Sequence, residues 1–300
     1  MPMTQRIMLS FILSIAALPI TSQAARRNMV QVKGSDTMVN LAQAWAEEYM
    51  KEHPGELIAV TGGGSGTGIS SLMASSADVA MCSRNIKPKE IELAEKKGIK
   101  PREFKVALDG LAIVVNPNNP VSKLTIGQLA DIFTGRVNNW KDVGGRDAKI
   151  VILSREVNSG THVYLKEHVL RKGDPNSKEE FASTALMLSS SQAIADEVAQ
   201  NPDAIGYYGM GYICNKQKPI EIAKEAAGPY FAPTVENVIK GDYPISRPLL
   251  FYSNGEPKES VKGFIDFTLS KKGQEIALMN DFVPITSAPP KVDSGKQPGQ

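Results

Sequence analysis

Three turns that join an apolar strand to a helical segment constrain the fold of this chain more than any other feature. Each turn combines glycine with small hydroxyl residues, and the turns are Gly34-Ser35-Asp36-Thr37, Gly64-Ser65-Gly66-Thr67-Gly68 and Ser159-Gly160-Thr161. Short apolar strands alternate with helical segments along the chain, and this alternation predicts an α/β architecture. Since a helix N-terminus presents unsatisfied N–H groups and a partial positive charge, the three turns together indicate a site for a small anion.

One arginine strengthens this interpretation. Arg155 ends a predicted strand, four residues before Ser159. A guanidinium group binds a tetrahedral oxyanion through two parallel hydrogen bonds. Any one of the turns alone is more often an ordinary helix cap, and a lone arginine more often joins a surface ion pair. The combination indicates a small, dehydrated oxyanion.

The chain lacks residues that known nucleotide-binding and nucleophile motifs require. Ile69 stands where a phosphate-binding P-loop requires Lys, and Thr67 stands where a dinucleotide fingerprint requires Gly or Ala. Neither Ser65 nor Ser159 has glycine on both sides at the spacing of a nucleophile elbow. The sequence shows no pairing of a nucleophile with histidine, so we expect no catalytic residue and no enzyme.

Metal, cofactor and nucleic-acid binding are not expected either. His53, His162 and His168 lack metal-site spacing, and we expect them at the surface. Two cysteines exclude a disulfide-rich scaffold and a four-thiolate zinc site. A bridge between Cys82 and Cys214 stays open, but we expect two unpaired, partly buried thiols. A net charge of +2 gives no basic footprint for nucleic acid.

Residues 1–24 have the pattern of a secretory signal peptide. Arg6 supplies the positive charge, an apolar run follows from Ile7 to Ile20, and Ser22-Gln23-Ala24 puts small residues at the cleavage-specifying positions. The run is shorter than the ~20 residues that a membrane span needs. We therefore expect cleavage after Ala24 and an exported, soluble mature protein.

The remaining pattern predicts the order of the elements. Strands are expected at 30–33, 57–60, 78–81, 104–108, 111–115, 150–153, 204–208 and 249–252, and helices at 38–51, 69–74, 88–97, 124–133, 162–172 and 258–269. The two strands around Asp109-Gly110 mark a domain crossing, and 135–145 is expected to be a loop. The stretch 287–300 is rich in Pro, Gly, Ser and Lys, which is typical of a disordered tail.

Several motifs now fall in a familiar order. They are Gly34-Ser35-Asp36-Thr37-Met38, the glycine-rich turn at 63–68, Ala77-Asp78-Val79-Ala80-Met81-Cys82-Ser83-Arg84, Asp109-Gly110-Leu111-Ala112-Ile113-Val114-Val115-Asn116, Ile132-Phe133-Thr134-Gly135 with Asn139-Trp140, Arg155 with Ser159-Gly160-Thr161, and Ala204-Ile205-Gly206-Tyr207. Over roughly residues 30–285, the chain resembles the periplasmic phosphate-binding proteins of high-affinity phosphate ABC transporters.

The resemblance implies a type II periplasmic binding protein fold, with two α/β lobes, each a mixed sheet flanked by helices, and the ligand in the cleft between them. Lobe I would be 28–112 plus 222–286, and lobe II would be 113–221. A monomer that delivers its ligand to an inner-membrane ABC permease is the family pattern. The ligand contacts carried over are Thr37 and Met38 through the backbone, Ser65, Arg155, Ser159, Gly160 and Thr161, with Ser35 in the first anion turn.

One departure bears on the choice of ion. Well-known members of the family have Asp just after the third strand, where this chain has Ser83 followed by Arg84. That Asp accepts a hydrogen bond from a protonated phosphate oxygen and repels sulfate, which has no proton to give. Asp36 is the nearest candidate replacement, although it is equally a helix cap. Arg84 could form either a surface ion pair or a second cationic ligand contact, and we expect the ligand contact.

The resemblance implies reversible capture of inorganic phosphate in the periplasm. The same role for sulfate, molybdate, arsenate or a phosphonate remains open because of Ser83. A secreted phosphatase and a phosphate sensor without a permease remain open as well.

Overall fold

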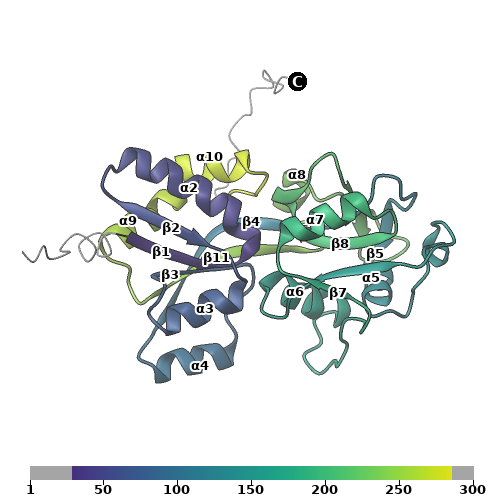
Figure 1. Ribbon diagram of the computed structural model, residues 1–300, viewed down its shortest axis with the longest axis horizontal. Helices are drawn as coiled ribbons and strands as arrows, with labels where there is room; N and C mark the ends of the chain where they lie inside the picture. Colours follow the sequence, from purple (N-terminus) through teal and green to yellow (C-terminus); the bar gives the residue numbers. More distant parts are fainter. Residues whose placement is uncertain (1–28, 286–300) are drawn as a thin grey trace, which may run out of the picture.

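The computed structural model describes residues 29–285, so the predicted signal peptide and the predicted tail at 287–300 lie outside the described residues. The chain forms two α/β lobes side by side (Figure 1), and the two-lobed α/β prediction is confirmed. One path of paired strands, β2-β1-β3-β11-β4-β8-β6-β7, runs through both lobes, with β9 on β4. Within the described part of the chain, no helix is long and apolar enough to cross a membrane.

The first lobe is a mixed sheet between two helical layers. Its strands are β1 (Met29–Gly34), β2 (Leu57–Thr61), β3 (Val79–Cys82) and β11 (Ser246–Asn254), and its helices are α2 (Val39–Glu52), α3 (Ser65–Met73), α4 (Pro88–Lys96), α9 (Glu259–Leu269) and α10 (Lys271–Met279). β1 is parallel to β2 and β3, whereas β11 is antiparallel to β3. Trp45, Phe251 and Phe264 are buried in its core.

The second lobe is contiguous in sequence. Its elements are β5 (Lys123–Thr125), α5 (Ile126–Phe133), β6 (Val151–Arg155), α6 (Gly160–Leu165), β7 (Leu186–Leu188), α7 (Ser191–Gln200), β8 (Ala204–Gly209), β9 (Lys218–Pro219), β10 (Glu221–Ala223) and α8 (Val235–Lys240). The second lobe also contains short 3-10 turns at Trp140–Val143 and Met210–Tyr212, and a π-helical turn, Lys166–Leu170, extends α6. The expected loop at 135–145 therefore contains a helical turn. A further 3-10 turn, Asp36–Met38, lies in the first lobe between β1 and α2.

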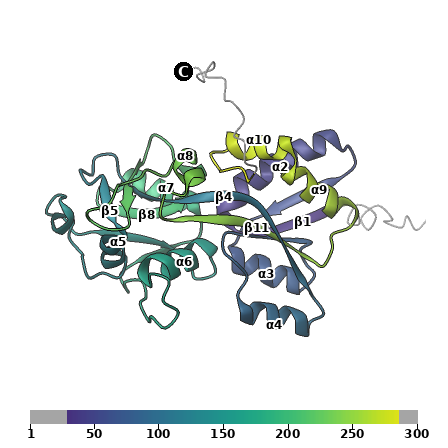
Figure 2. The ribbon, with the colours of Figure 1, turned by 180° about the vertical axis from the view of Figure 1, so that it is seen from behind.

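A single long strand, β4 (Pro101–Val115), connects the lobes. Its residues 101–110 pair with β11, and its residues 111–115 pair with β8. Figure 2 shows β4 and β11 crossing the middle of the molecule together. The expectation of two separate strands around Asp109-Gly110 was wrong. A Cβ atom at Gly110 would lie 3.0 Å from Val238 and 3.2 Å from the Met210 sulfur, so this glycine allows close packing rather than a turn.

The packing of 221–245 counts against a lobe boundary at 222. β10 pairs with β5. Val238, Tyr243 and Ile245 are buried in the same cluster as Leu124, which belongs to the second lobe. The sequence did not reveal that 221–245 packs with the second lobe, because β10 and β5 are almost a hundred residues apart along the chain. The chain returns to the first lobe only at β11.

Candidate functional site

The turn after β1 and the turn after β2 are packed against each other. Gly34 has a φ of 146°, and a Cβ atom there would overlap the carbonyl oxygen of Met81. Instead, that oxygen accepts a hydrogen bond from the Ser35 N–H at 2.7 Å, and the Gly64 N–H donates to the Gly34 carbonyl at 2.8 Å. The glycines thus bring both turns to one edge of the first lobe.

Three serines of the first lobe form a buried hydroxyl cluster at this edge. Ser35 Oγ donates to Ser83 Oγ at 2.8 Å, and the Ser83 N–H donates to Ser65 Oγ at 3.1 Å. All three side chains are almost fully buried. Gly160 of the second lobe lies directly against them, since a Cβ atom there would be 2.7 Å from Ser83 Oγ and 3.0 Å from Ser65 Cβ.

Two threonines meet across the lobes beside this cluster. Thr37, in the first turn, and Thr161, in α6, are both buried, and their Oγ1 atoms are 2.8 Å apart. Ser159 caps α6 by accepting a hydrogen bond from the His162 N–H. Residues from all three predicted turns are therefore brought together at one place between the lobes.

Arg155 lies at the second-lobe side of this place and is 1% exposed. Its Nη1 donates to Ser191 Oγ and its Nη2 donates to the Ser189 carbonyl, both at 2.9 Å. Its Nε is buried without a hydrogen-bond partner within residues 29–285. Burial lowers the pKa of this arginine, and the nearby Asp36 carboxylate opposes the shift. Arg155 thus offers one unpaired, charged N–H group.

Asp36 joins the lobes. Its Oδ2 accepts a hydrogen bond from the Ser191 N–H at the start of α7 (2.6 Å) and lies 3.2 Å from Arg155 Nη1. A carboxylate is favourable at a helix N-terminus, because the N–H groups there carry partial positive charge. The 3-10 turn that begins at Asp36 shows no side-chain cap, so Asp36 forms a contact between the lobes and does not cap its own helical turn.

Asn158 is a site residue that the sequence did not reveal. Its carbonyl accepts a hydrogen bond from the Gly66 N–H at 3.0 Å, and its Nδ2 donates to the Gly63 carbonyl at 2.9 Å. A Cβ atom at Gly64 would be 2.8 Å from the Asn158 carbonyl oxygen. Part of the glycine-rich turn therefore serves the close approach of the lobes.

Two of the predicted contacts have other partners. Arg84 binds both carboxylate oxygens of Glu90, at 2.8 and 2.7 Å, and the Asn85 carbonyl at 2.8 Å. Arg84 therefore forms an ion pair, which is the alternative that the sequence left open. The Met38 N–H donates to the Ser35 carbonyl at 3.0 Å, and its side chain packs in the first-lobe core.

A buried ion pair lies beneath the threonines and also escaped the sequence reasoning. Arg247 and Asp109 face each other in the register of β11 and β4, and both side chains are fully buried. Arg247 Nε and Nη2 donate to Asp109 Oδ2 at 3.0 and 2.8 Å. The available signal was a charged residue just before an apolar run in each strand, Asp109 before 111–115 and Arg247 before 249–251.

His162 is 2% exposed, so its expected surface position was wrong; His53 and His168 are exposed. The Nδ1 atom of His162 lies 3.2 Å from Ser154 Oγ, which is 2.7 Å from the Tyr207 hydroxyl. Burial lowers the pKa of His162 to about 4. This is a pairing of serine with histidine that the sequence did not reveal, and Ser154 is 0% exposed. The network supports the strand that carries Arg155.

The two cysteines are unpaired, as predicted, but the expectation that both are partly buried was wrong, since Cys82 is buried and Cys214 is exposed. Among residues 29–285, no group of three His, Cys, Asp or Glu side chains is arranged to hold a metal ion.

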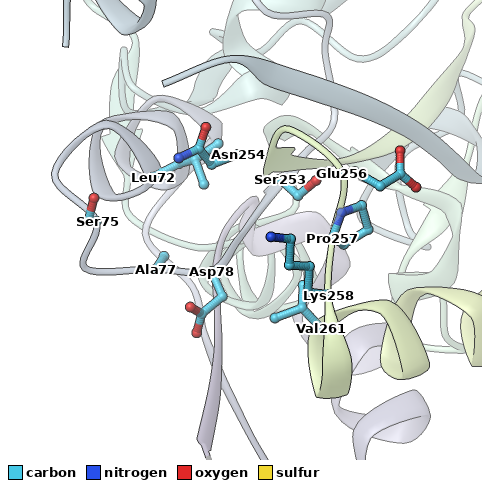
Figure 3. Close-up of a pocket in the computed structure, with 10 residues that line it drawn as sticks. All are labelled: Leu72, Ser75, Ala77, Asp78, Ser253, Asn254, Glu256, Pro257, Lys258 and Val261. Carbon is cyan, nitrogen blue, oxygen red and sulfur yellow. The ribbon is translucent and has the colours of Figure 1, made fainter. Parts of the chain in front are cut away.

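The surface hollow in Figure 3 lies away from this site, between α3 and the start of α9, and has a volume of about 390 Å³. Its two carboxylates lie at opposite ends and have partners elsewhere. Asp78 accepts the Gln31 N–H at 2.7 Å, and Glu256 pairs with Arg102. These two carboxylates therefore do not converge in the hollow.

Comparisons with known proteins agree with one another. The PBP superfamily domain matches residues 20–272. The phosphate-binding protein PstS of Pseudomonas aeruginosa is 34% identical over 84% of this chain and 81% of its own length. PstS of Bacillus subtilis is 30% identical over 89% of this chain and 84% of its own.

Solved structures give the same result. A putative phosphate ABC transporter substrate-binding protein with bound phosphate, from Clostridium perfringens, has a TM-score of 0.77 at 33% identity and covers 86% of this chain and 100% of its own. An ABC-type phosphate transport receptor from Vibrio cholerae has a TM-score of 0.67 at 32% identity, covering 85% of this chain and 99% of its own.

Proposed function

The chain belongs to the PstS phosphate-binding proteins of the PBP superfamily, and on this premise we propose that it binds inorganic phosphate between its two lobes and delivers it to an ABC permease. The observation that carries the proposal is the buried convergence of hydroxyl groups from both lobes beside a guanidinium whose Nε has no partner within residues 29–285. Such a set of donors suits a small tetrahedral anion.

The proposed contacts come from both lobes. Arg155 supplies charge and the unpaired Nε–H, which forms a charge-assisted hydrogen bond to a phosphate oxygen. The surrounding hydroxyl and N–H donors are those of Ser35, Thr37, Ser65, Ser83, Ser159, Gly160 and Thr161. These groups are nearly free of bulk water, and an interaction between charges is stronger where the dielectric constant is low.

Because the proposed contacts come from both lobes, phosphate binding should drive the lobes together. A ligand shifts a conformational equilibrium only if it binds one state better than the other. Ser65 and Ser83 lie on the first lobe, whereas Arg155 and Thr161 lie on the second, so phosphate contacts the full set only when the lobes are together. The bonds of Asp36 and Asn158 across the lobes stabilise the same arrangement. The closed pair of lobes is then the form that the permease recognises.

Selectivity is proposed to rest on Asp36. Ser83 carries no charge, and the Asp36 carboxylate is the negative group in direct contact with Arg155. A negative charge at this position disfavours sulfate and accepts the proton of hydrogen phosphate. Replacement of Asp36 by Asn should therefore reduce the preference for phosphate over sulfate. An unchanged ratio of the two affinities would contradict this role.

The signal-peptide pattern supports an exported, periplasmic protein, and we propose that it acts as a monomer without catalysis. The test is isothermal titration of the ligand-stripped mature chain with phosphate and then with sulfate. One-to-one phosphate binding with little sulfate binding supports the proposal. Equal or tighter sulfate binding would assign the protein to another oxyanion, and release of phosphate from a phosphomonoester would make it an enzyme.

A further inference from the structure

Arg247 is a buried cation to which the proposed phosphate contacts give no role. It lies on β11, at the point where the chain re-enters the first lobe, and its side chain is 0% exposed. Asp109 neutralises it through two hydrogen bonds, and the second oxygen of Asp109 accepts the Met210 N–H at 3.0 Å. The ring of Tyr164 lies under the guanidinium at 5.5 Å. The arginine is thus held rigidly from several sides.

The donors that remain on Arg247 point at groups of the proposed phosphate site. Nη1 donates to the Ser83 carbonyl at 3.1 Å. Nη2 donates to Thr161 Oγ1 at 3.1 Å and lies 3.5 Å from Thr37 Oγ1. One guanidinium therefore touches the first lobe at Thr37 and Ser83, and the second lobe at Thr161.

These contacts fix the direction of the hydroxyl protons. A threonine hydroxyl has one O–H donor and two lone pairs. Arg247 has only donors, so it occupies a lone pair of each hydroxyl that it contacts and turns the O–H away from itself. Thr37 and Thr161 are 2.8 Å apart. One of their two protons lies between them, and the other is available to an acceptor.

From this geometry, and resting on the proposed binding of phosphate, we infer that Arg247 is a positioning residue of the oxyanion site. It orients Thr37 and Thr161 as hydrogen-bond donors from both lobes and places a positive charge behind them. Because β11 is paired with the strand that joins the lobes, the guanidinium keeps its place for both threonines. It acts through these hydroxyls rather than by direct contact with phosphate.

A double-mutant cycle between Arg247 and Thr161 tests this role. Arg247→Lys keeps the positive charge but removes the planar guanidinium, which bonds Asp109 and Thr161 at the same time. Thr161→Val removes the hydroxyl. We expect Arg247→Lys to weaken phosphate binding about 10- to 100-fold in the wild-type background, and by a factor at least about 3-fold smaller in the Thr161→Val background, where only Thr37 remains for Arg247 to orient. The control is Arg136→Lys, a half-exposed arginine of the second lobe that pairs with Asp131, and it should leave the affinity unchanged.

Equal losses in both backgrounds would overturn the inference, and so would wild-type affinity in Arg247→Lys. Wild-type protein that does not bind phosphate would instead overturn the proposed function. If Arg247→Lys does not fold, nuclear magnetic resonance of the wild-type guanidinium groups decides. We expect the Arg247 Nη signals to shift when phosphate is added, while those of Arg84, held by Glu90, stay in place. An unmoved Arg247 signal refutes the positioning role.

Discussion

Replacement of Gly160 by Ala should weaken phosphate binding strongly without damage to either lobe. Gly160 begins α6 on the second lobe and faces the serines of the first. An added Cβ atom would be 2.7 Å from Ser83 Oγ and 3.0 Å from Ser65 Cβ, and closer still to Ser65 Oγ. Real Cβ contacts essentially never fall below 3.0 Å. The lobes must separate, or the serine side chains must turn.

Either response removes hydrogen bonds from the proposed phosphate site. A hydrogen bond to a charged group contributes about 1.5–3 kcal/mol, so the loss of even one such bond costs about 1.5–3 kcal/mol. This corresponds to a decrease in affinity of about 10- to 150-fold or more. The ligand-free protein should keep its melting temperature, because alanine is favourable in a helix and Gly160 does not have a positive φ.

The assay is isothermal titration with phosphate, paired with a thermal melt of the ligand-free protein. Gly127→Ala is the matched control. It also lies near the start of a second-lobe helix, α5, and its added Cβ atom would find only Thr125 Oγ1, at an ordinary 3.7 Å. Wild-type affinity in Gly160→Ala would refute the reasoning. A loss of affinity in Gly127→Ala as large as that in Gly160→Ala would show that the effect is not local to the site.

Single contacts elsewhere in the molecule support three more predictions. Asn158→Ala should weaken phosphate binding about 10-fold in the same titration, because it removes an Nδ2 bond between the lobes; an unchanged affinity would show that this bond is absent when the ligand binds. Arg84→Gln should lower the melting temperature but leave the affinity within about 2-fold, since Arg84 binds Glu90; a large loss of affinity would restore Arg84 to the site. The unfolded His162 takes up its proton near pH 6.5 and the folded one only near pH 4, so stability from this residue is complete above pH 6.5 and decreases by up to about 3 kcal/mol as the pH falls to 4. Denaturant melts of wild type and His162→Gln across this range should show a smaller acid loss in the variant, and parallel curves would contradict the assignment.

The sequence predicted those parts of the site that depend on local structure. The three turns follow from glycine and hydroxyl residues next to apolar strands, and each formed where expected. The ion pair of Arg84 was not the preferred expectation, because its partner Glu90 lies in the first turn of α4, where a glutamate is equally typical of a solvent-exposed position. The local sequence pattern cannot distinguish a glutamate that pairs with a nearby arginine from one that faces solvent.

The parts that the sequence missed depend on contacts between distant segments. Arg247 and Asp109 are 138 residues apart, and only the register of β11 on β4 makes them partners. The burial of His162 comes from the packing of Phe181 against its ring, at a centroid distance of 4.5 Å. Neither contact has a periodic signature along the chain, so the Arg247–Asp109 ion pair was not predicted and His162 was expected at the surface.

The return of the chain through β11 also has a consequence for the order of assembly. The second lobe is built from one continuous stretch that runs from the second half of β4 to the start of β11, whereas the first lobe needs β11, α9 and α10 from the C-terminal part. During synthesis, β3 and the first half of β4 emerge long before the strand that must lie between them. Because domains fold as units, the second lobe is able to fold while the first lobe still waits for its central strand, and the oxyanion site forms last.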